Sequence, residues 1–169
     1  IPAASSTTRA TASPGRPIVT SRAFHLAQIN IGRLNAPVDD PSLVAFMAAL
    51  DPVNTLAEQS PGFVWRLKDE SGHATYIRAY DDPQMIVNVT VWESLEALRD
   101  FTYLGVHKGV LGRRNEWFEK LDGPYMALWW IDAGAVPTTG EGVARIDHLA
   151  RHGPGEHAFT FAQPFPRPA

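Results

Sequence analysis

The sequence of 169 residues contains no cysteine. This excludes disulfides, zinc–thiolate sites, cysteine nucleophiles and thiolate ligation of haem, and it suits a cytoplasmic protein. No apolar run approaches the roughly 20 residues that a membrane-spanning helix needs. The excess of one charge sign over the other is also small, because the net charge is -3 at pH 7 and no block of Lys or Arg occurs. The composition therefore argues against a partner that is a nucleic acid or a membrane surface.

Length and composition predict one globular domain with flanking segments. Hydrophobic residues make up 44% of the chain and charged residues 20%, which allows a sizeable buried core. Residues 1–22 are rich in Ser, Thr, Ala and Pro and hold no acidic residue, so we expect a flexible N-terminal tail. The domain itself is expected over residues 23–152. Residues 153–169 contain three phenylalanines among prolines, so we expect this segment to pack on the domain or on a partner.

Apolar residues that alternate along the chain predict four main strands. They cover residues 24–32, 63–68, 84–92 and 125–131, and residues 74–80 are expected to add a short fifth strand. Helical spacing predicts helices over residues 42–59, 93–118 and 140–152. Asp40 and Pro41 provide a cap and a first turn for the first of these helices. The second is expected to break near Gly105, because glycine disfavours a helix interior.

The order strand, helix, strand, strand, helix, strand predicts an α+β fold of the ferredoxin-like βαββαβ type with extra helices. In the strand over residues 84–92, the positions Met85, Val87, Val89 and Val91 are apolar and suit packing against helices. The other face is expected to stay open and to carry Leu26, Asn30, Trp92 and either Trp65 or Trp129. That is too much apolar surface to expose. We therefore expect a homodimer in which two sheets close against each other as a dimeric α+β barrel.

Polar side chains on the expected open face indicate a ligand pocket. Gln28, Asn30, Asn88 and Thr90 lie on neighbouring strands, beside Trp65, Trp92, Trp129 and Tyr103. Ligand sites are mostly apolar and contain a few polar groups, which fits this mixture. Each amide or hydroxyl taken alone is more often a satisfied buried group than a ligand, and only their grouping on neighbouring strands favours a pocket.

One stripe of the helix over residues 101–118 is unusual for a buried face. Tyr103, His107, Val110, Arg114 and Trp117 recur at steps of four and three residues. His107 is a candidate general base for a phenolic substrate, and Arg113 or Arg114 is a candidate for stabilising the resulting oxyanion. Alternatively, His107 is a packed or capping histidine, or a haem ligand. The arginines alternatively pair with Glu116, Glu119 or a partner chain.

No metal site is predicted. The other five histidines are dispersed along the chain: His25, His73, His148, His152 and His157. His148 and His152 are four residues apart but lack a third ligand. Glycine-rich phosphate loops, nucleophile elbows and paired-carboxylate signatures do not occur either.

The segment Ile-Val-Asn-Val-Thr-Val-Trp-Glu-Ser at residues 86–94, followed by a helix, resembles the dimeric α+β barrel superfamily that includes antibiotic-biosynthesis monooxygenases. The chain is more closely similar to a bacterial domain-of-unknown-function branch of that superfamily. The shared segments are residues 26–31, 60–67, 91–94, 107–118 and 128–130. The resemblance covers about residues 24–165.

This resemblance implies a set of site residues. The cofactor-independent oxygenases of the superfamily oxidise aromatic polyketides and use an Asn and a Trp on this strand, with an Arg on a later segment. Asn88 and Trp92 match the Asn and Trp, and Arg113 or Arg114 falls at the distance expected for the Arg. The Tyr implicated in that group has no firm match here, and Tyr103 is the nearest candidate.

Two hypotheses follow for function. The first is an oxygenase that acts on a polycyclic aromatic or phenolic intermediate of natural-product biosynthesis, such as an aromatic polyketide antibiotic, by quinone formation or oxidative ring opening. It would use O2 without a cofactor, or with reduced flavin or haem as the alternatives, and a cofactor-free cyclase or isomerase would use the same pocket. The second hypothesis is a non-catalytic dimer that binds a small molecule.

Overall fold

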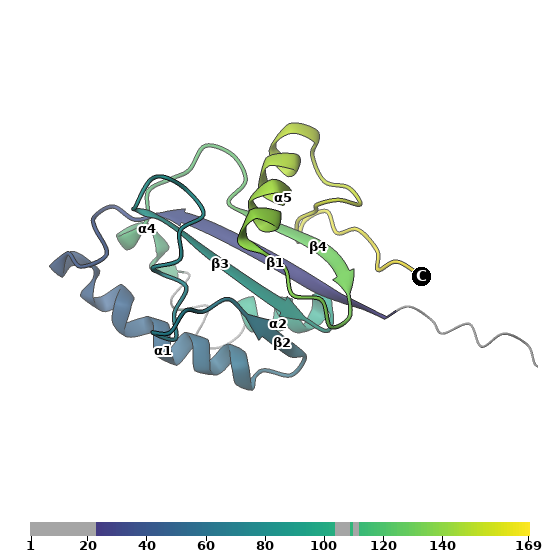
Figure 1. Cartoon of the computed structure of the whole chain (residues 1–169), viewed down its shortest axis with the longest axis horizontal. Coiled ribbons are helices and arrows are strands. Elements are labelled where there is room, and N and C mark those ends of the chain that lie inside the picture. The colour runs from purple at the N-terminus through teal and green to yellow at the C-terminus, as the bar shows by residue number, and fades with distance from the viewer. Residues whose placement is uncertain (1–22, 104–108, 110–111) are drawn as a thin grey trace, which may run out of the picture.

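The computed structural model describes residues 23–103, 109 and 112–169, and an antiparallel four-stranded sheet lies at its centre (Figure 1). The strands are β1 (Phe24–Arg33), β2 (Phe63–Arg66), β3 (Met85–Trp92) and β4 (Met126–Asp132). Their order across the sheet is β2-β3-β1-β4, the order of the ferredoxin-like βαββαβ unit. The α+β fold expected from the sequence is therefore confirmed.

The helices follow the expected positions where the structure describes them, and the expected break near Gly105 lies outside the described residues. They are α1 (Val44–Gln59), α2 (Leu95–Tyr103), α4 (Arg114–Trp117) and α5 (Thr139–His152). A 3-10 turn over Pro41–Leu43 precedes α1, and the Asp40 carboxylate accepts the Ser42 N–H at 2.9 Å. The Thr138 hydroxyl caps α5 by accepting the Glu141 N–H at 3.1 Å. Among the described residues, no helix has the length and apolarity needed to cross a membrane.

The expected fifth strand over residues 74–80 is wrong, because this segment forms turns rather than a strand. The Ile77 N–H donates to the Ala74 carbonyl at 3.0 Å, within a local turn. Ile77, Ala79 and Tyr80 instead pack against one face of the sheet. The β-branched and aromatic residues that suggested a strand thus serve as a cover for that face.

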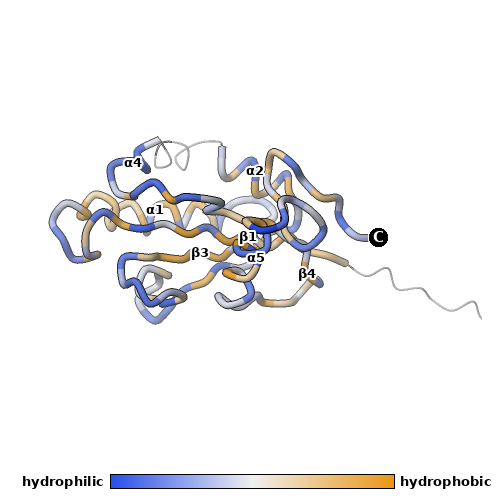
Figure 2. Tube along the Cα trace, turned by 90° about the horizontal axis from the view of Figure 1, so that it is seen from above, coloured by the Kyte–Doolittle hydropathy of each residue, from blue (hydrophilic) through white to orange (hydrophobic). Residues whose placement is uncertain are grey.

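The two faces of the sheet differ in chemistry, and we call them the aliphatic face and the amide face. The aliphatic face carries Ala27, Ile29, Val87, Val89 and Val91 and packs against α5 and the segment 67–80. The amide face carries Leu26, Gln28, Asn30, Asn88, Thr90 and Trp92, as the paired registers of β1 and β3 show. Figure 2 shows the strands edge-on, with α1, α2 and α4 gathered on one side.

The expectation that the amide face stays open is wrong, because α1, α2 and α4 cover it within one chain. Leu26 and Trp92 pack with Leu98 of α2, and Leu34 packs with Phe46 of α1. The aliphatic face packs against a helix, as expected, and that helix is α5. Since both faces are covered, the homodimer stays a prediction that no longer follows from exposed apolar surface.

The C-terminal segment packs along the edge of β4 in the same chain. Phe159 and Leu128 exchange two backbone hydrogen bonds of 2.9 Å. The Trp130 indole N–H donates to the Phe165 carbonyl at 3.0 Å, and the Arg167 guanidinium lies 5.2 Å from the centre of the Trp130 ring. These contacts cover an edge strand that would otherwise expose unpaired backbone groups.

Candidate active site

A cavity of about 160 Å³ lies between α1, the amide face of β1 and β3, the loop after β2, and α4. Its apolar walls include Phe46, Leu50, Ile86, Trp117 and Phe118. An engineered apolar cavity of about 150 Å³ is large enough to bind benzene. The cavity therefore has room for one aromatic ring.

Close backbone approach brings one aromatic wall against β1. A Cβ atom at Gly32 would lie 2.6 Å from Cδ1 of Phe118, so only glycine lets this ring lie on the strand. Leu34 forms a β-bridge with Phe118, and the Asn35 N–H donates to the Trp117 carbonyl at 3.0 Å. The segment after α4 is thus docked on the end of β1.

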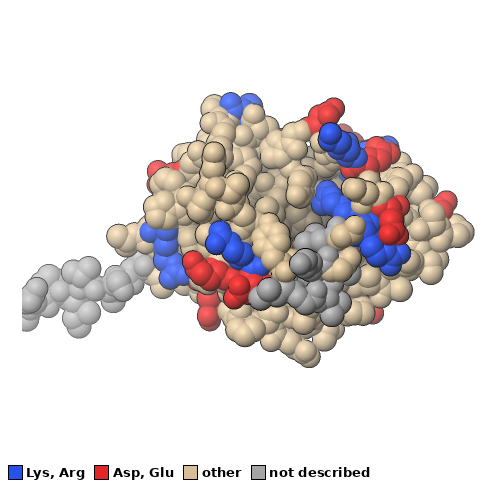
Figure 3. All heavy atoms as spheres, turned by 180° about the vertical axis from the view of Figure 1, so that it is seen from behind, with Lys and Arg blue, Asp and Glu red and all other residues tan. Residues whose placement is uncertain are grey.

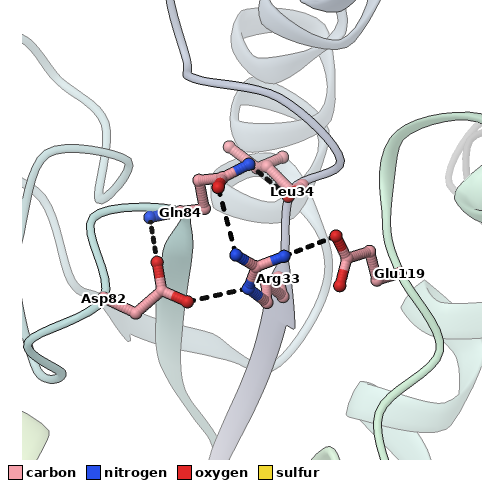
Figure 4. Close-up of polar contacts among 5 residues, drawn as sticks. All are labelled: Arg33, Leu34, Asp82, Gln84 and Glu119. Atoms are coloured by element: carbon pink, nitrogen blue, oxygen red, sulfur yellow. Dashed lines mark hydrogen bonds and ion pairs between the residues drawn. The ribbon is translucent and has the colours of Figure 1, made fainter.

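Arg33 fixes three chain segments around this end of the sheet (Figure 4). Its Nε donates to Asp82 at 2.7 Å, its Nη2 donates to Gln84 at 3.1 Å, and its Nη1 pairs with Glu119. The side-chain amide of Gln84 donates in turn to the Leu34 carbonyl at 2.9 Å. The hydrogen bond from Arg33 lowers the pKa of the Asp82 carboxyl. Arg33 therefore ties the start of β3 and the residue after Phe118 to β1.

A chain of hydrogen bonds crosses the amide face and ends at the cavity. The Trp92 indole N–H donates to the Thr90 hydroxyl at 2.9 Å, and that hydroxyl donates to Gln28 Oε1 at 2.7 Å. Gln28 Nε2 donates to Asn30 Oδ1 at 2.9 Å, and Asn88 Nδ2 donates to the same oxygen at 3.2 Å. Because Asn30 Oδ1 accepts both bonds, its NH2 group and the Asn88 carbonyl remain available where these residues line the cavity.

Arg114 brings a positive charge to the cavity without a carboxylate partner. Its guanidinium lies 4.3 Å from the centre of the Tyr125 ring, and Nη2 donates to the Ile31 carbonyl at 3.3 Å. Burial lowers its pKa. No acidic side chain among the described residues pairs with it, and the remaining residues of the chain include no Asp or Glu. The other cavity arginine, Arg66, is neutralised by Glu58 at 2.8 Å.

The structure also places His73 at the cavity, a residue that the sequence interpretation left among dispersed histidines. Its Nδ1 is 3.4 Å from Asn54 Nδ2, and its Nε2 is 3.5 Å from Asp51 Oδ1. The side chain is 16% exposed. Its position in a loop gives no periodic signal from which this placement could be predicted.

The predicted site residues separate into groups. Asn30, Asn88 and Arg114 line the cavity together, whereas Gln28 and Thr90 are buried behind it in the hydrogen-bond chain. Trp92 is also buried, stacked on Phe101 at 5.0 Å between ring centres, so its indole does not face the cavity.

Other predicted residues lie elsewhere. The expected grouping is wrong for Trp65 and Trp129, because both pack on the aliphatic face. Trp129 donates its indole N–H to Glu141 there, at 3.1 Å. Tyr103 is half exposed and contacts the Phe161 ring. Arg113 pairs with Glu116 at 2.7 Å, as the alternative interpretation expected. His107 lies outside the described residues.

Outside the cavity, neither charged patches nor groups of metal-ligating side chains indicate a second site in the described ranges. Figure 3 shows basic and acidic side chains interspersed on the face seen there, without a broad patch of one sign. The rings of His148, His152 and His157 gather at the end of α5, with centres 4.5 and 5.2 Å from that of His148. Across residues 23–103, 109 and 112–169, no group of three His, Cys, Asp or Glu has the geometry for a metal ion.

Comparison with known proteins identifies a sequence family and several distant structural relatives. The family described as "Domain of unknown function (DUF3291)" matches residues 25–169. A search of curated proteins finds no match.

Three solved structures illustrate the likeness in fold. SnoaB, a cofactor-independent oxygenase from Streptomyces nogalater, has 16% identity and a TM-score of 0.44, covering 68% of this chain and 97% of its own. Rv0793 from Mycobacterium tuberculosis has 14% identity and a TM-score of 0.44, covering 68% and 99%. The NE2512 protein of unknown function from Nitrosomonas europaea has 10% identity and a TM-score of 0.43, covering 70% and 97%. The fold assignment given above depends on the strand order of this chain.

Proposed function

Because the chain belongs to the DUF3291 family, we infer its activity from the site and propose an oxygenase that acts on a phenolic aromatic compound. The family agrees with the expected resemblance to a domain-of-unknown-function branch. One ring of the substrate occupies the cavity, and O2 is the oxidant. The substrate class is an electron-rich aromatic intermediate of natural-product biosynthesis, of the aromatic polyketide type.

The observation that carries this proposal is Arg114. A half-buried guanidinium in an apolar cavity, with no carboxylate partner in the chain, favours a ligand that supplies the negative charge. A cavity of about 160 Å³ with aromatic walls favours a ring as the rest of that ligand. A phenolate combines the two properties.

The amides of Asn30 and Asn88 support the same ligand class. Asn30 offers an N–H donor and Asn88 offers a carbonyl acceptor, since the hydrogen-bond chain from Trp92 fixes the acceptor role of Asn30 Oδ1. A ring with one ionised oxygen and one hydroxyl matches this donor and acceptor. Trp92, which the superfamily resemblance assigned to the site, would then act through Thr90 and Gln28 by orienting the amides.

The proposed chemistry uses the electrons of the substrate. Loss of a phenolic proton gives a delocalised anion whose ring carbon reduces O2 to a carbon-bound hydroperoxide. Where this carbon is a CH2 group in the keto tautomer of the phenol, the hydroperoxide then loses water, so that CH2 and O2 become a carbonyl group and H2O. Fixed donors such as Arg114 stabilise the anion and lower the barrier to this reaction. The described cavity, at about 160 Å³, is too small to enclose a porphyrin, so the proposal does not involve haem.

Oxygen consumption tests the proposal. Purified protein is mixed with an anthrone, which carries such a CH2 position, and O2 uptake and quinone absorbance are followed above the rate of autoxidation. Arg114→Leu is expected to lower the rate at least about tenfold, the loss that accompanies a missing charged contact in the transition state. Arg113→Leu is the matched control, because Arg113 is paired with Glu116 outside the cavity. Equal rates for both variants, or no O2 uptake above autoxidation, would contradict the proposal.

A further inference from the structure

His73 is held beside the cavity by groups from three segments. Asp51 and Asn54 project from α1 toward its two ring nitrogens, at 3.5 and 3.4 Å. The His73 carbonyl accepts the Asp69 N–H at 2.9 Å and closes a turn. Arg66 donates to the Gly72 carbonyl at 2.8 Å and anchors that turn to β2. The imidazole is therefore presented to the cavity by a braced loop.

The two ring nitrogens of His73 have different partners. Nε2 faces the carboxylate of Asp51, which can accept an N–H from it. Among the described residues, the partner of Nδ1 is the amide nitrogen of Asn54, at a long 3.4 Å. This arrangement favours the tautomer with hydrogen on Nε2 and leaves Nδ1 as a weakly held acceptor. An imidazole oriented by a carboxylate at Nε2, with only a long contact to an amide at Nδ1, is suited to accept a proton there.

We propose that His73 is the proton acceptor of this site, oriented by Asp51, and that its substrate is a phenol conjugated to a second oxygen across the ring. The inference depends on the proposed function, since it assigns a residue to the deprotonation step. The proton leaves the substrate hydroxyl for Nδ1 of His73, and the electron pair of the O–H bond stays on the substrate. The negative charge delocalises through the ring to the distal oxygen, where Arg114 and the Asn30 amide stabilise it.

The charges around His73 favour this step. The imidazolium that forms faces the Asp51 carboxylate through Nε2, and the carboxylate of Asp69 is close enough to interact with it electrostatically. The cations near this loop are Arg66 and Lys68, which both face the Glu58 carboxylate at 2.8 and 3.7 Å, and Arg78, which donates to the Thr75 carbonyl at 2.8 Å. Arg114 lines the same cavity, and its charge is the one that the phenolate compensates. Proton transfer thus converts a neutral imidazole and a neutral phenol into an imidazolium beside the Asp51 carboxylate and a phenolate beside the Arg114 guanidinium.

Binding of 4-nitrophenol tests the inference, because its phenolate is coloured and its nitro group mimics the distal oxygen. Calorimetry in two buffers with different heats of ionisation counts the protons exchanged on binding at about pH 8, where an ordinary imidazole is neutral. Wild type is expected to take up about one proton while the bound ligand keeps the phenolate colour. In His73→Gln the uptake is expected to fall to about zero.

Control variants separate a proton acceptor from a structural histidine. His148→Gln lies on α5, outside the cavity, and is expected to keep the wild-type proton uptake. Asp51→Asn changes an exposed carboxylate without disturbing the core and is expected to lower the uptake, which keeps the inference testable if His73→Gln folds poorly. Imidazole added to His73→Ala is expected to restore part of the oxygenase rate.

Three outcomes are decisive. Equal proton uptake in wild type and in His73→Gln would overturn the role of His73 while leaving the cavity as a phenol site. Uptake accompanied by loss of the phenolate colour would place the proton on the ligand and would also overturn that role. A wild-type protein that binds no 4-nitrophenol would overturn this inference together with the proposed function.

Discussion

Replacement of Thr90 by Val tests whether the buried hydrogen-bond chain stabilises the amide face. The Thr90 hydroxyl accepts from Trp92 at 2.9 Å and donates to Gln28 at 2.7 Å. Thr90 and Gln28 are 5% and 7% exposed and Trp92 is fully buried, so water cannot take the place of the hydroxyl. Valine keeps the branched shape of threonine but offers neither a donor nor an acceptor.

The expected loss is large for a single methyl-for-hydroxyl change. Two buried polar groups, the Trp92 N–H and the Gln28 carbonyl, lose a partner, and each such group costs about 1–3 kcal/mol. We therefore expect Thr90→Val to lower the free energy of unfolding by about 2–6 kcal/mol. Thr90→Ser keeps the hydroxyl and removes only a methyl group, for about 1 kcal/mol.

Urea unfolding followed by tryptophan fluorescence measures both variants. A loss for Thr90→Val no larger than that for Thr90→Ser would refute the reasoning, since it would mean that the hydroxyl is not needed by its neighbours. In the folded Thr90→Val protein, the Gln28 amide loses the partner that fixes its orientation. Binding of 4-nitrophenol is then expected to weaken, because the Asn30 side-chain amide is no longer held with its NH2 group toward the cavity.

Two further predictions concern close packing and acid stability. Gly142→Ala is expected to destabilise the protein by about 1–3 kcal/mol in thermal unfolding, because the added Cβ would lie 2.6 Å from Ile29. Gly140→Ala is the control and should be neutral or stabilising, because no atom lies within 4 Å of its added Cβ. Arg33 lowers the pKa of Asp82 in the folded state, so this pair contributes stability above the unfolded-state pKa and loses it as the pH falls through the folded-state pKa. Asp82→Asn should therefore be less stable than wild type in urea at neutral pH, and the difference should disappear in acid; a gap that persists there would contradict the assignment.

The four main strands could be predicted from the sequence because alternation identifies both a strand and the residues that share one of its faces. Asn30 and Asn88 were placed on one face from this pattern, and the register pairs them directly across β1 and β3. The pattern could not tell which helix covers which face. Both faces carry apolar residues, and α5 covers one of them, so alternation looks the same whether a face meets its own chain or a second one.

The cavity shows a similar division. Arg114 could be predicted because it recurs on a helical stripe with aromatic residues. His73 could not, because a loop has no period and its place depends on the turn that Arg66 anchors to β2. Trp65 was placed with the wrong residues for a related reason. The register of β2 shifts between Phe63 and Trp65, and Trp65 pairs with Val91 of the aliphatic face.

Arg114 is the residue that a purely structural account of the cavity explains least well. Arg33, Arg66 and Arg113 each meet a carboxylate, at Asp82, Glu58 and Glu116. Within the part of the chain that the structure describes, Arg114 has one hydrogen bond, to the Ile31 carbonyl, and ring contacts with Phe118 and Tyr125. Such ring contacts contribute about 0.5–2 kcal/mol each, less than the several kcal/mol needed to bury a cation.

A guanidinium carries five N–H donors in a planar fork that matches an oxyanion. A side chain whose role was only to pack against rings would stabilise the fold better as a neutral residue, because no cation would have to be desolvated. Arg114→Met is therefore expected to raise the free energy of unfolding of the ligand-free protein while abolishing the binding of 4-nitrophenol. A variant that loses stability and still binds the ligand would show that the charge serves the fold. The opposite signs of the two effects would identify Arg114 as a binding residue that is retained at a cost in stability.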